Sequence, residues 1–174
     1  GTGKTIAYLL ATLPIAKRHD LKLVVSTATV ALQEQLINKD LPELAEYAGL
    51  NFRYTLAKGR GRYLCLNKAE QLLDNQVSLG QMALYEDEEA LKVEPSVLEK
   101  VRSIMQRYAE GIWDGDKDKL AEAPSDETWN LLTSDHMQCS NRRCINFSVC
   151  PFYRAREQMI DADLVIANHV LVLA

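Results

Sequence analysis

The spacing of hydrophobic residues changes along the chain and predicts alternating helices and strands in its first third. Apolar positions recur every three or four residues in 5–18, which favours an amphipathic helix, and Pro14 predicts a kink within it. Residues 21–26 form a continuous apolar run of strand length instead. Because this run does not alternate with polar residues, we expect a strand buried on both faces, as in a parallel sheet.

The next stretch returns to helical spacing and then to a short extended run. Residues 27–39 place apolar side chains on one helical face. Residues 40–48 predict a second short helix with Pro42 in its first turn, where proline is tolerated. Residues 51–57 predict a further strand.

The middle of the chain is mostly helical by pattern, and its end returns to a strand. Residues 66–134 carry the helical spacing, and Ser125 is the expected N-cap of one helix. Pro151 fits the first turn of a helix that runs to about Ile160. Residues 163–167 predict another short buried strand.

This order of elements indicates an α/β fold with an insertion. We expect a partial parallel sheet in residues 1–57 and 161–174, interrupted by a mainly helical insertion over residues 58–160. The composition, with 47% hydrophobic and 25% charged residues in a chain of 174, is that of a soluble globular protein with a sizeable core.

Charge and hydropathy exclude two simple functional classes. The net charge of −4 gives no global signal for nucleic acid, so a nucleic-acid site has to be local. No apolar run approaches the length of a membrane span, so we expect no membrane partner and a cytoplasmic location. The chain starts without methionine and inside a motif, so we expect further residues upstream.

The first five residues, Gly1 to Thr5, match the second half of a phosphate-binding loop. Glycine lets backbone amides approach phosphates closely. We expect Lys4 to reach the β- and γ-phosphates of ATP and Thr5 to ligate Mg²⁺, with Gly1, Thr2 and Gly3 completing the nucleotide site. The following helix would direct its positive N-terminus at the anion. A chance glycine turn with an exposed lysine is the alternative.

The four cysteines are arranged as one distant residue, Cys65, and a group of three, Cys139, Cys144 and Cys150. This asymmetry suits a [4Fe–4S] cluster better than the paired spacing that is typical of zinc sites. Because Cys150 directly precedes the helix that begins at Pro151, we expect the helix N-terminus to lower the pKa of its thiol. Zinc, two disulfides or four separate structural thiols are the alternatives.

Two local groups of basic residues accompany the cysteines. The first is Arg53, Lys58, Arg60 and Arg62, and the second is Arg142, Arg143, Arg154 and Arg156. If the cysteines come together, these groups meet in space, and a basic surface with aromatic faces suits single-stranded nucleic acid. For Arg60, Arg62 and Arg143, a DNA-phosphate contact and a solvated charged face are equal alternatives. We expect Phe147 and Phe152 to pack around the cluster instead.

These motifs together resemble those of the iron–sulfur superfamily 2 DNA helicases of the XPD type, and the resemblance covers essentially the whole chain. It rests on six segments: residues 1–5 (end of motif I), 25–29 with 32–33 (motif Ia), 59–65 (first cluster-ligand segment), 113–115, 139–152 and 167–169.

The resemblance implies a RecA-like motor domain, residues 1–57 and 161–174, with an iron–sulfur cluster domain, residues 58–160, inserted in it. It implies ATP-driven 5′→3′ translocation on single-stranded DNA and separation of forked strands, with the cluster domain as a wedge. It implies Lys4 and Thr5 as catalytic residues, a DNA contact at Thr27, and a role in DNA repair or replication conflicts. A single-strand-binding protein is an expected partner.

The family also has parts that this chain lacks, namely the Walker B Asp-Glu-x-His box and a second motor domain with its arginine finger. We therefore expect the intact protein to be a helicase and this segment alone to be inactive. We further expect the strands at 21–26 and 163–167 to have unpaired edges and uncovered apolar faces. Two other functions stay open: a metal-stapled single-stranded nucleic-acid-binding module without ATPase activity, and a redox-gated DNA-dependent ATPase.

Overall fold

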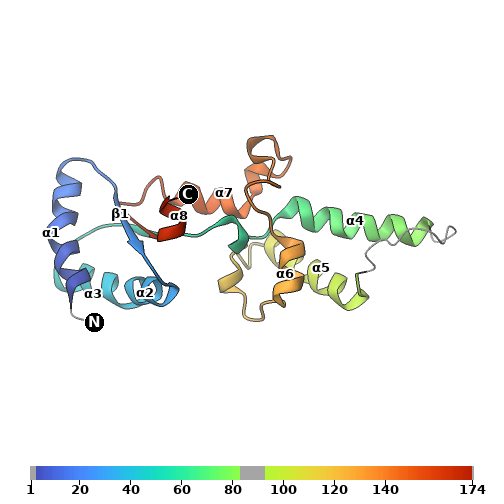
Figure 1. Ribbon diagram of the computed structural model, residues 1–174, viewed down its shortest axis with the longest axis horizontal. Helices are drawn as coiled ribbons and strands as arrows, with labels where there is room; N and C mark the ends of the chain where they lie inside the picture. Colours follow the sequence, from blue (N-terminus) through green and yellow to red (C-terminus); the bar gives the residue numbers. More distant parts are fainter. Residues whose placement is uncertain (1–2, 83–92, 174) are drawn as a thin grey trace. The chain divides into compact units, whose positions relative to one another are not determined.

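The computed structural model describes residues 3–82 and 93–173. The chain divides into two compact units (Figure 1). Unit 1 comprises Gly1–Gly59 and Ala155–Ala174, and unit 2 comprises Arg60–Arg154. Each unit is described below by itself.

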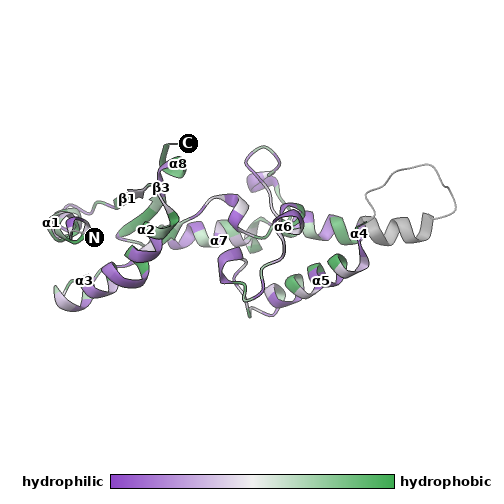
Figure 2. Ribbon diagram, turned by 60° about the horizontal axis from the view of Figure 1, so that its bottom comes forward, coloured by the Kyte–Doolittle hydropathy of each residue, from purple (hydrophilic) through white to green (hydrophobic). Residues whose placement is uncertain are grey.

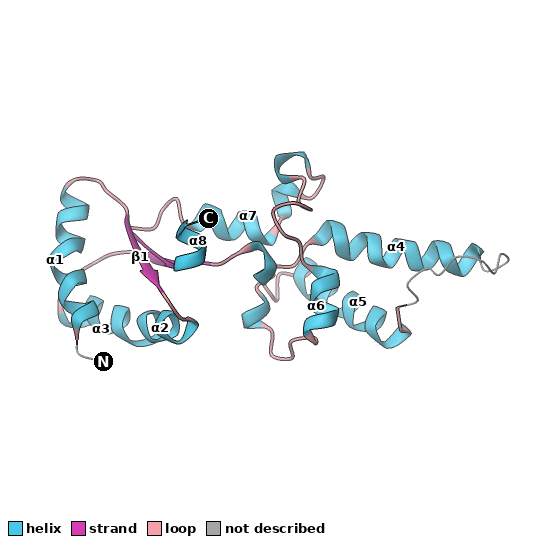
Figure 3. Ribbon diagram, viewed as in Figure 1, coloured by secondary structure: helices cyan, strands magenta, loops and turns pink. Residues whose placement is uncertain are grey.

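Unit 1 is an α/β unit that holds all three named strands of the described chain (Figure 3). Its elements match the predicted order of helix, strand, helix and strand, followed much later by a third strand. They are α1 (Lys4–Arg18), β1 (Leu23–Thr27), α2 (Val30–Gln35), a π-helical turn (Leu36–Asp40), α3 (Leu41–Tyr47), β2 (Tyr54–Ala57), β3 (Leu164–Asn168) and α8 (His169–Leu173).

The three strands form one parallel sheet in the order β1-β3-β2. Ile166 of β3 pairs with Val25 on one side and with Leu56 on the other. The parallel sheet was predicted, but the unpaired edges expected for residues 163–167 were wrong. The strand from the far end of the chain is the central one, and its ladder bonds are made on both sides.

One face of the sheet carries the main core of unit 1. Leu9 and Leu13 of α1 are buried against Val25, Leu164 and Ile166 of the strands. The helices that follow β1 complete this cluster with Leu36, Leu41 and Leu44. The predicted apolar stripe of α1 is therefore buried at Leu9 and Leu13, whereas Leu10 is 43% exposed, and Pro14 lies inside the helix.

The other face of the sheet is covered only in part. A smaller cluster packs Ala57, Val165 and Ala167 with residues from the stretch just before β3. Val24 pairs with Val165 in register, yet its side chain is 52% exposed. The prediction that this strand is buried on both faces was therefore wrong, because the smaller cluster covers β3 and β2 without reaching β1. The uncovered apolar face and the unpaired edge expected for residues 21–26 are confirmed, since β1 is an edge strand of the described sheet.

Unit 2 is mainly helical, as predicted for the middle of the chain. It contains α4 (Leu66–Met82), α5 (Pro95–Ala109), α6 (Asp126–Leu132) and short 3₁₀ turns at Arg60–Arg62, Lys117–Lys119, Asn141–Arg143 and Phe147–Val149. Helix α7 (Pro151–Gln158) begins in unit 2 with its proline in the first turn, as expected. Ser125 caps α6 by accepting a hydrogen bond from the backbone amide of Thr128, which confirms the predicted N-cap.

The core of unit 2 is built around two tryptophans. Trp113 and Trp129 pack edge to face with ring centroids 6.5 Å apart, and both side chains are almost fully buried. Each indole N–H finds a backbone acceptor: Trp113 donates to Asp116 at 2.8 Å, and Trp129 donates to Gly61 at 2.7 Å. The hydropathy colouring of Figure 2 shows the apolar residues of α4, α5 and α6 that contribute to this core.

Among the glycines of unit 2 that the structure describes, Gly115 is the one where an added Cβ has no room. Its φ is +89°, and a Cβ placed there would lie 2.4 Å from the Cβ of Pro151 and 3.3 Å from the ring of Tyr108. Gly111 has a similar φ of +71°, but nothing lies within 4 Å of its Cβ position.

We expect Gly115→Ala to destabilise unit 2 by about 2–5 kcal/mol, because backbone strain and steric overlap add together. Gly111→Ala is the matched control and should cost only the strain, about 1–2 kcal/mol. Urea unfolding followed by tryptophan fluorescence measures both. If both variants lose the same free energy of unfolding, the overlap with Pro151 does not contribute to the destabilisation.

Candidate functional site

The phosphate-binding segment leads directly into α1. Gly3 is the N-cap residue of α1 with a left-handed φ of 65°, a conformation that favours glycine. Lys4 is exposed and Thr5 is half-buried in the first turn of this 15-residue helix. A helix N-terminus with these side chains can bind an anion, because its amides and dipole are positive there. Gly1 and Thr2 lie outside the described residues.

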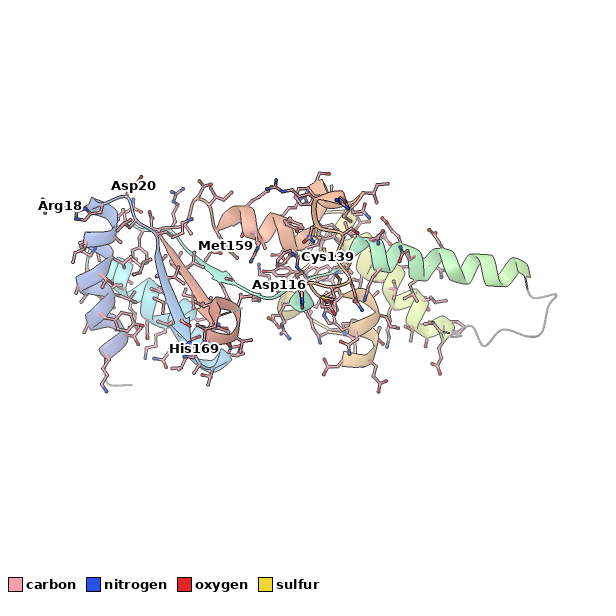
Figure 4. The ribbon with its side chains drawn as sticks, turned by 45° about the horizontal axis from the view of Figure 1, so that its top comes forward. Arg18, Asp20, Asp116, Cys139, Met159 and His169 are labelled. Atoms are coloured by element: carbon pink, nitrogen blue, oxygen red, sulfur yellow. The ribbon has the colours of Figure 1, made fainter. Side chains whose placement is uncertain are left out.

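The carboxyl ends of β1 and β3 lie side by side and bring several polar groups together. Thr27 is buried, and its hydroxyl donates a hydrogen bond of 3.4 Å to the carbonyl of Ala167. Ser26 and His169 are exposed and are joined by a hydrogen bond between Oγ and Nδ1. Figure 4 labels His169 at this edge of the sheet. Ligands of open α/β sheets bind at this end of the strands.

All four cysteines belong to unit 2, and none forms a disulfide. Each thiol is partly exposed. Cys65 precedes α4, and the other three lie on the segment between α6 and α7 (Cys139 is labelled in Figure 4). The described chain contains no group of three or more Cys, His, Asp or Glu side chains close enough to hold a metal ion as it stands.

The thiols nevertheless influence one another electrostatically. Burial raises the pKa of the Cys65 thiol, and charge on the other three cysteines raises it further, while a backbone hydrogen bond from Lys68 lowers it. Burial also raises the pKa of Cys150, and charge on Cys139 and Cys144 adds to the rise. The thiols of Cys65 and Cys150 therefore lie within electrostatic reach of the other cysteines, and sulfur is a ligand type that suits soft metal ions.

The expected effect of the helix start on Cys150 is present but does not dominate. Backbone amides of Phe152 and Tyr153 in the first turn of α7 do lower the pKa of its thiol. Burial acts in the opposite direction and is the larger cause, so the pKa is raised. The helix N-terminus therefore acts in the predicted direction, but burial outweighs it and the net pKa of Cys150 is raised.

Arg60 links the segment before Cys65 to the three-cysteine segment. Its guanidinium donates to the sulfur of Cys139 at 3.0 Å and to Oδ1 of Asn141 at 2.8 Å. It also lies over the ring of Phe152, 4.3 Å from the centroid, and 5.4 Å from that of Tyr153. Arg60 of the first basic group therefore contacts the segment that carries the second group. Side chains of unit 2 hold its guanidinium in place there.

Arg62 and Arg143 have different surroundings from Arg60. Arg62 forms an ion pair with Asp118 on the surface of unit 2. Arg143 is exposed in the 3₁₀ turn between Cys139 and Cys144. Of the three arginines, Arg143 thus has the side chain most open to a ligand.

The aromatic residues near the cysteines pack into the unit as expected. Phe152 is buried at 6% exposure and contacts the ring of Tyr63 with centroids 5.8 Å apart. Phe147 is half-buried and packs on Tyr153 at 4.4 Å. The hydroxyl of Tyr153 donates to Asn141 at 2.9 Å. These rings form a supporting layer for the cysteine segment.

Sequence reasoning missed three contacts. They are the Ser26–His169 bond, the engagement of Arg60 by Asn141, and the close approach of Gly115 to Pro151. The partners are separated by between 36 and 143 residues, so no local pattern could have paired them. The only sequence signal was that each of these residues lies in one of the segments on which the family resemblance rests.

Comparison with curated proteins shows which proteins the sequence of this chain is similar to. The curated proteins that match the chain are ATP-dependent DNA helicases. They are DinG helicases, and the match extends over the entire chain. The DinG of Photobacterium profundum is 40% identical over 174 residues, and those of Escherichia coli K12 and Salmonella typhimurium are each 36% identical over 177 residues.

The chain covers 24% of the length of these relatives, about a quarter. The resemblance to a DNA helicase family that the motifs predicted is therefore confirmed for this segment. The chain matches no protein-family model. In the part of the chain that the structure describes, no helix is both long enough and apolar enough to cross a bilayer.

Proposed function

We propose that this chain is part of an ATP-dependent DNA helicase that moves 5′→3′ on single-stranded DNA and separates forked strands. The observation that carries the proposal is the 36–40% identity to DinG helicases along the whole chain. The parallel sheet with α1 behind the Gly-x-Gly-Lys-Thr segment supports it, since motor ATPases place that segment at a helix N-terminus. A cytoplasmic location and a role in DNA repair or replication conflicts belong to the same proposal.

In this function residues 1–57 and 161–174 form part of the first motor domain. Residues 1–5 bind ATP and Mg²⁺: Lys4 neutralises the β- and γ-phosphates, and Thr5 ligates the metal ion. Lys4 is exposed in the first turn of α1, so its ammonium group can reach a phosphate bound at the helix N-terminus. Forked DNA and a single-strand-binding protein are the proposed partners.

The four cysteines fit a [4Fe–4S] cluster as a donor set, and residues 58–160 would form the domain that holds it. Cys65, Cys139, Cys144 and Cys150 supply the thiolates, and the cluster would act as a covalent staple within that domain. Arg60 donates to the sulfur of Cys139 at 3.0 Å. Hydrogen bonds to the ligand atoms are the usual way in which a protein orients the ligands of a metal centre.

DNA contacts in this proposal come from Arg143, Arg62 and Thr27. The main role of Arg60 is to hold the cysteine segment through its hydrogen bonds to Cys139 and Asn141. Arg143→Ala in the intact protein should weaken single-strand binding for all sequences and reduce the salt slope by about one. Arg60→Ala should leave the salt slope nearly unchanged and destabilise unit 2 by about 1–3 kcal/mol, because it removes hydrogen bonds to Cys139 and Asn141 and the packing of the guanidinium on Phe152. Binding titrations at several salt concentrations, with thermal unfolding in parallel, separate the two. A slope change at Arg60 equal to that at Arg143 would make Arg60 a phosphate contact.

The test of the proposed function is a strand-separation assay on the intact protein. ATP-dependent release of one strand from a substrate with a 5′ single-stranded tail is expected, and no release from one with a 3′ tail. Iron and sulfide assays on anaerobically purified protein test the cluster separately. Absence of ATP-dependent unwinding on both substrates would refute the helicase proposal.

A further inference from the structure

The segment between Cys139 and Cys150, here called the cysteine loop, exposes two large aliphatic side chains, Val149 at 39% and, far more openly, Ile145. Ile145 is 86% exposed, directly after Cys144. A single exposed isoleucine needs no explanation by itself. Its surroundings decide whether the exposure has a use.

The backbone around Ile145 is held on both sides. The amide of Cys144 bonds to the carbonyl of Asn141 at 3.0 Å, and the amide of Phe147 bonds to the carbonyl of Cys144 at 3.1 Å. The side-chain amide of Asn146 donates to Glu70 of α4 at 2.7 Å. Ile145 therefore sits between two 3₁₀ turns that are tied to the rest of unit 2, and its exposure does not come from a fraying end.

The loop separates its apolar side chains into two groups. Phe147 turns toward unit 2, where it packs on Tyr153. Ile145 takes no part in any buried cluster of the described chain. The loop therefore packs its aromatic residue on Tyr153 but leaves an isoleucine exposed, and this isoleucine offers an apolar surface to a binding partner.

The charge beside Ile145 indicates what that partner is. Arg142 and Arg143 precede it by three and two residues, and both are exposed. A single strand of nucleic acid offers phosphates, which arginine can bind. It also offers base faces, against which an apolar side chain can pack. Apolar side chains that contact base faces next to basic residues are a known mode of nucleic-acid binding.

We propose that Ile145 packs against a base of single-stranded DNA while Arg142 and Arg143 neutralise phosphates of the same strand. The inference rests on the proposed function, because that function supplies DNA as the polyanion. It adds a base contact, which is independent of charge, to the phosphate contact already proposed for Arg143.

The experiment compares Ile145→Ala with Ile112→Ala in the intact protein, on two single-stranded oligonucleotides of equal length. One oligonucleotide carries bases, and the other is abasic at every position, so both have the same charge. Ile112 is the control because it is a 65% exposed isoleucine of unit 2 that lies outside the cysteine loop. Iron content and thermal unfolding of each variant verify that unit 2 is intact.

Ile145→Ala should weaken binding of the normal strand about fivefold, leave the abasic strand unaffected and keep the salt slope unchanged. Ile112→Ala should change neither strand. Equal weakening on both strands, or none on either, would overturn the base contact. Failure of the proposed function looks different: the wild-type protein would then show no ATP-dependent unwinding, whether or not it binds the two strands.

Discussion

Lys4→Ala in the intact protein is expected to reduce ATP-dependent unwinding by at least about 10²-fold, the usual effect of removing a group that stabilises transition-state charge. Lys4 stands exposed at the first residue of α1, where a cation can reach phosphates bound at the helix N-terminus. Single-strand binding should be unchanged, because the proposed DNA contacts lie elsewhere. Unwinding kinetics and a binding titration on the same preparation measure the two effects.

Arg18→Ala is the matched control for this prediction. Arg18 is an exposed cation in the last turn of the same helix, far along the axis from the phosphate-binding end. Its removal should cost only a helix-dipole contribution to stability, about 0.3–1 kcal/mol. Strong unwinding by Lys4→Ala, or equal losses in both variants, would contradict the role given to Lys4.

Cys144→Ser is expected to remove most of the bound iron and sulfide and to loosen unit 2. The cysteine loop is short of buried apolar residues, so a cluster would replace part of a core there. Hydrogen exchange should rise in the loop and in the first turn of α7, while the core of unit 1 around Leu9 and Ile166 keeps its protection. Iron and sulfide assays with hydrogen-exchange mass spectrometry test this.

Ser148→Ala serves as the control for the cysteine variant. Ser148 is exposed in the same loop, inside the 3₁₀ turn that precedes Cys150. Its iron content should equal that of the wild type. If the wild-type protein is colourless and carries stoichiometric zinc without sulfide, the cluster proposal fails and the four cysteines form a zinc site instead.

The helices and strands of this chain were largely predictable because their signals are local. Ser125 and Pro151 begin helices as their side-chain chemistry requires, and residues 163–167 read as a strand without any knowledge of its neighbours. The single helix expected over residues 27–39 was less accurate. The chain instead forms a six-residue α-helix and then a π-helical turn at Leu36–Asp40.

The errors concern burial and pairing, which depend on distant residues. Val24 belongs to a continuous apolar run, but its exposure is decided by whether a second layer reaches β1. The central place of β3 follows from the crossover of the chain and not from its own sequence. The pKa of Cys150 depends on the balance between burial and helix amides, and only the second of these could be read from Pro151.

The candidate site shows the same division between local and distant information. Lys4 and the four cysteines were chosen from residue type and spacing alone. The surroundings of Arg60 were not predictable, since its partners Cys139 and Asn141 are about eighty residues away. Sequence placed Arg60 near the cysteines, but the hydrogen bond to a sulfur appears only in three dimensions.

The central position of β3 has a consequence for synthesis of the protein. β1 and β2 leave the ribosome early, but the strand that joins them is made only after all of unit 2. With roughly a hundred residues in between, at about 5–20 residues per second, the two strands wait roughly 5–20 s for their common neighbour. During that interval their backbone donors and acceptors are open to other chains or to a chaperone. Rapid folding of unit 2 would therefore shorten the distance that β3 has to search and protect the nascent sheet from aggregation.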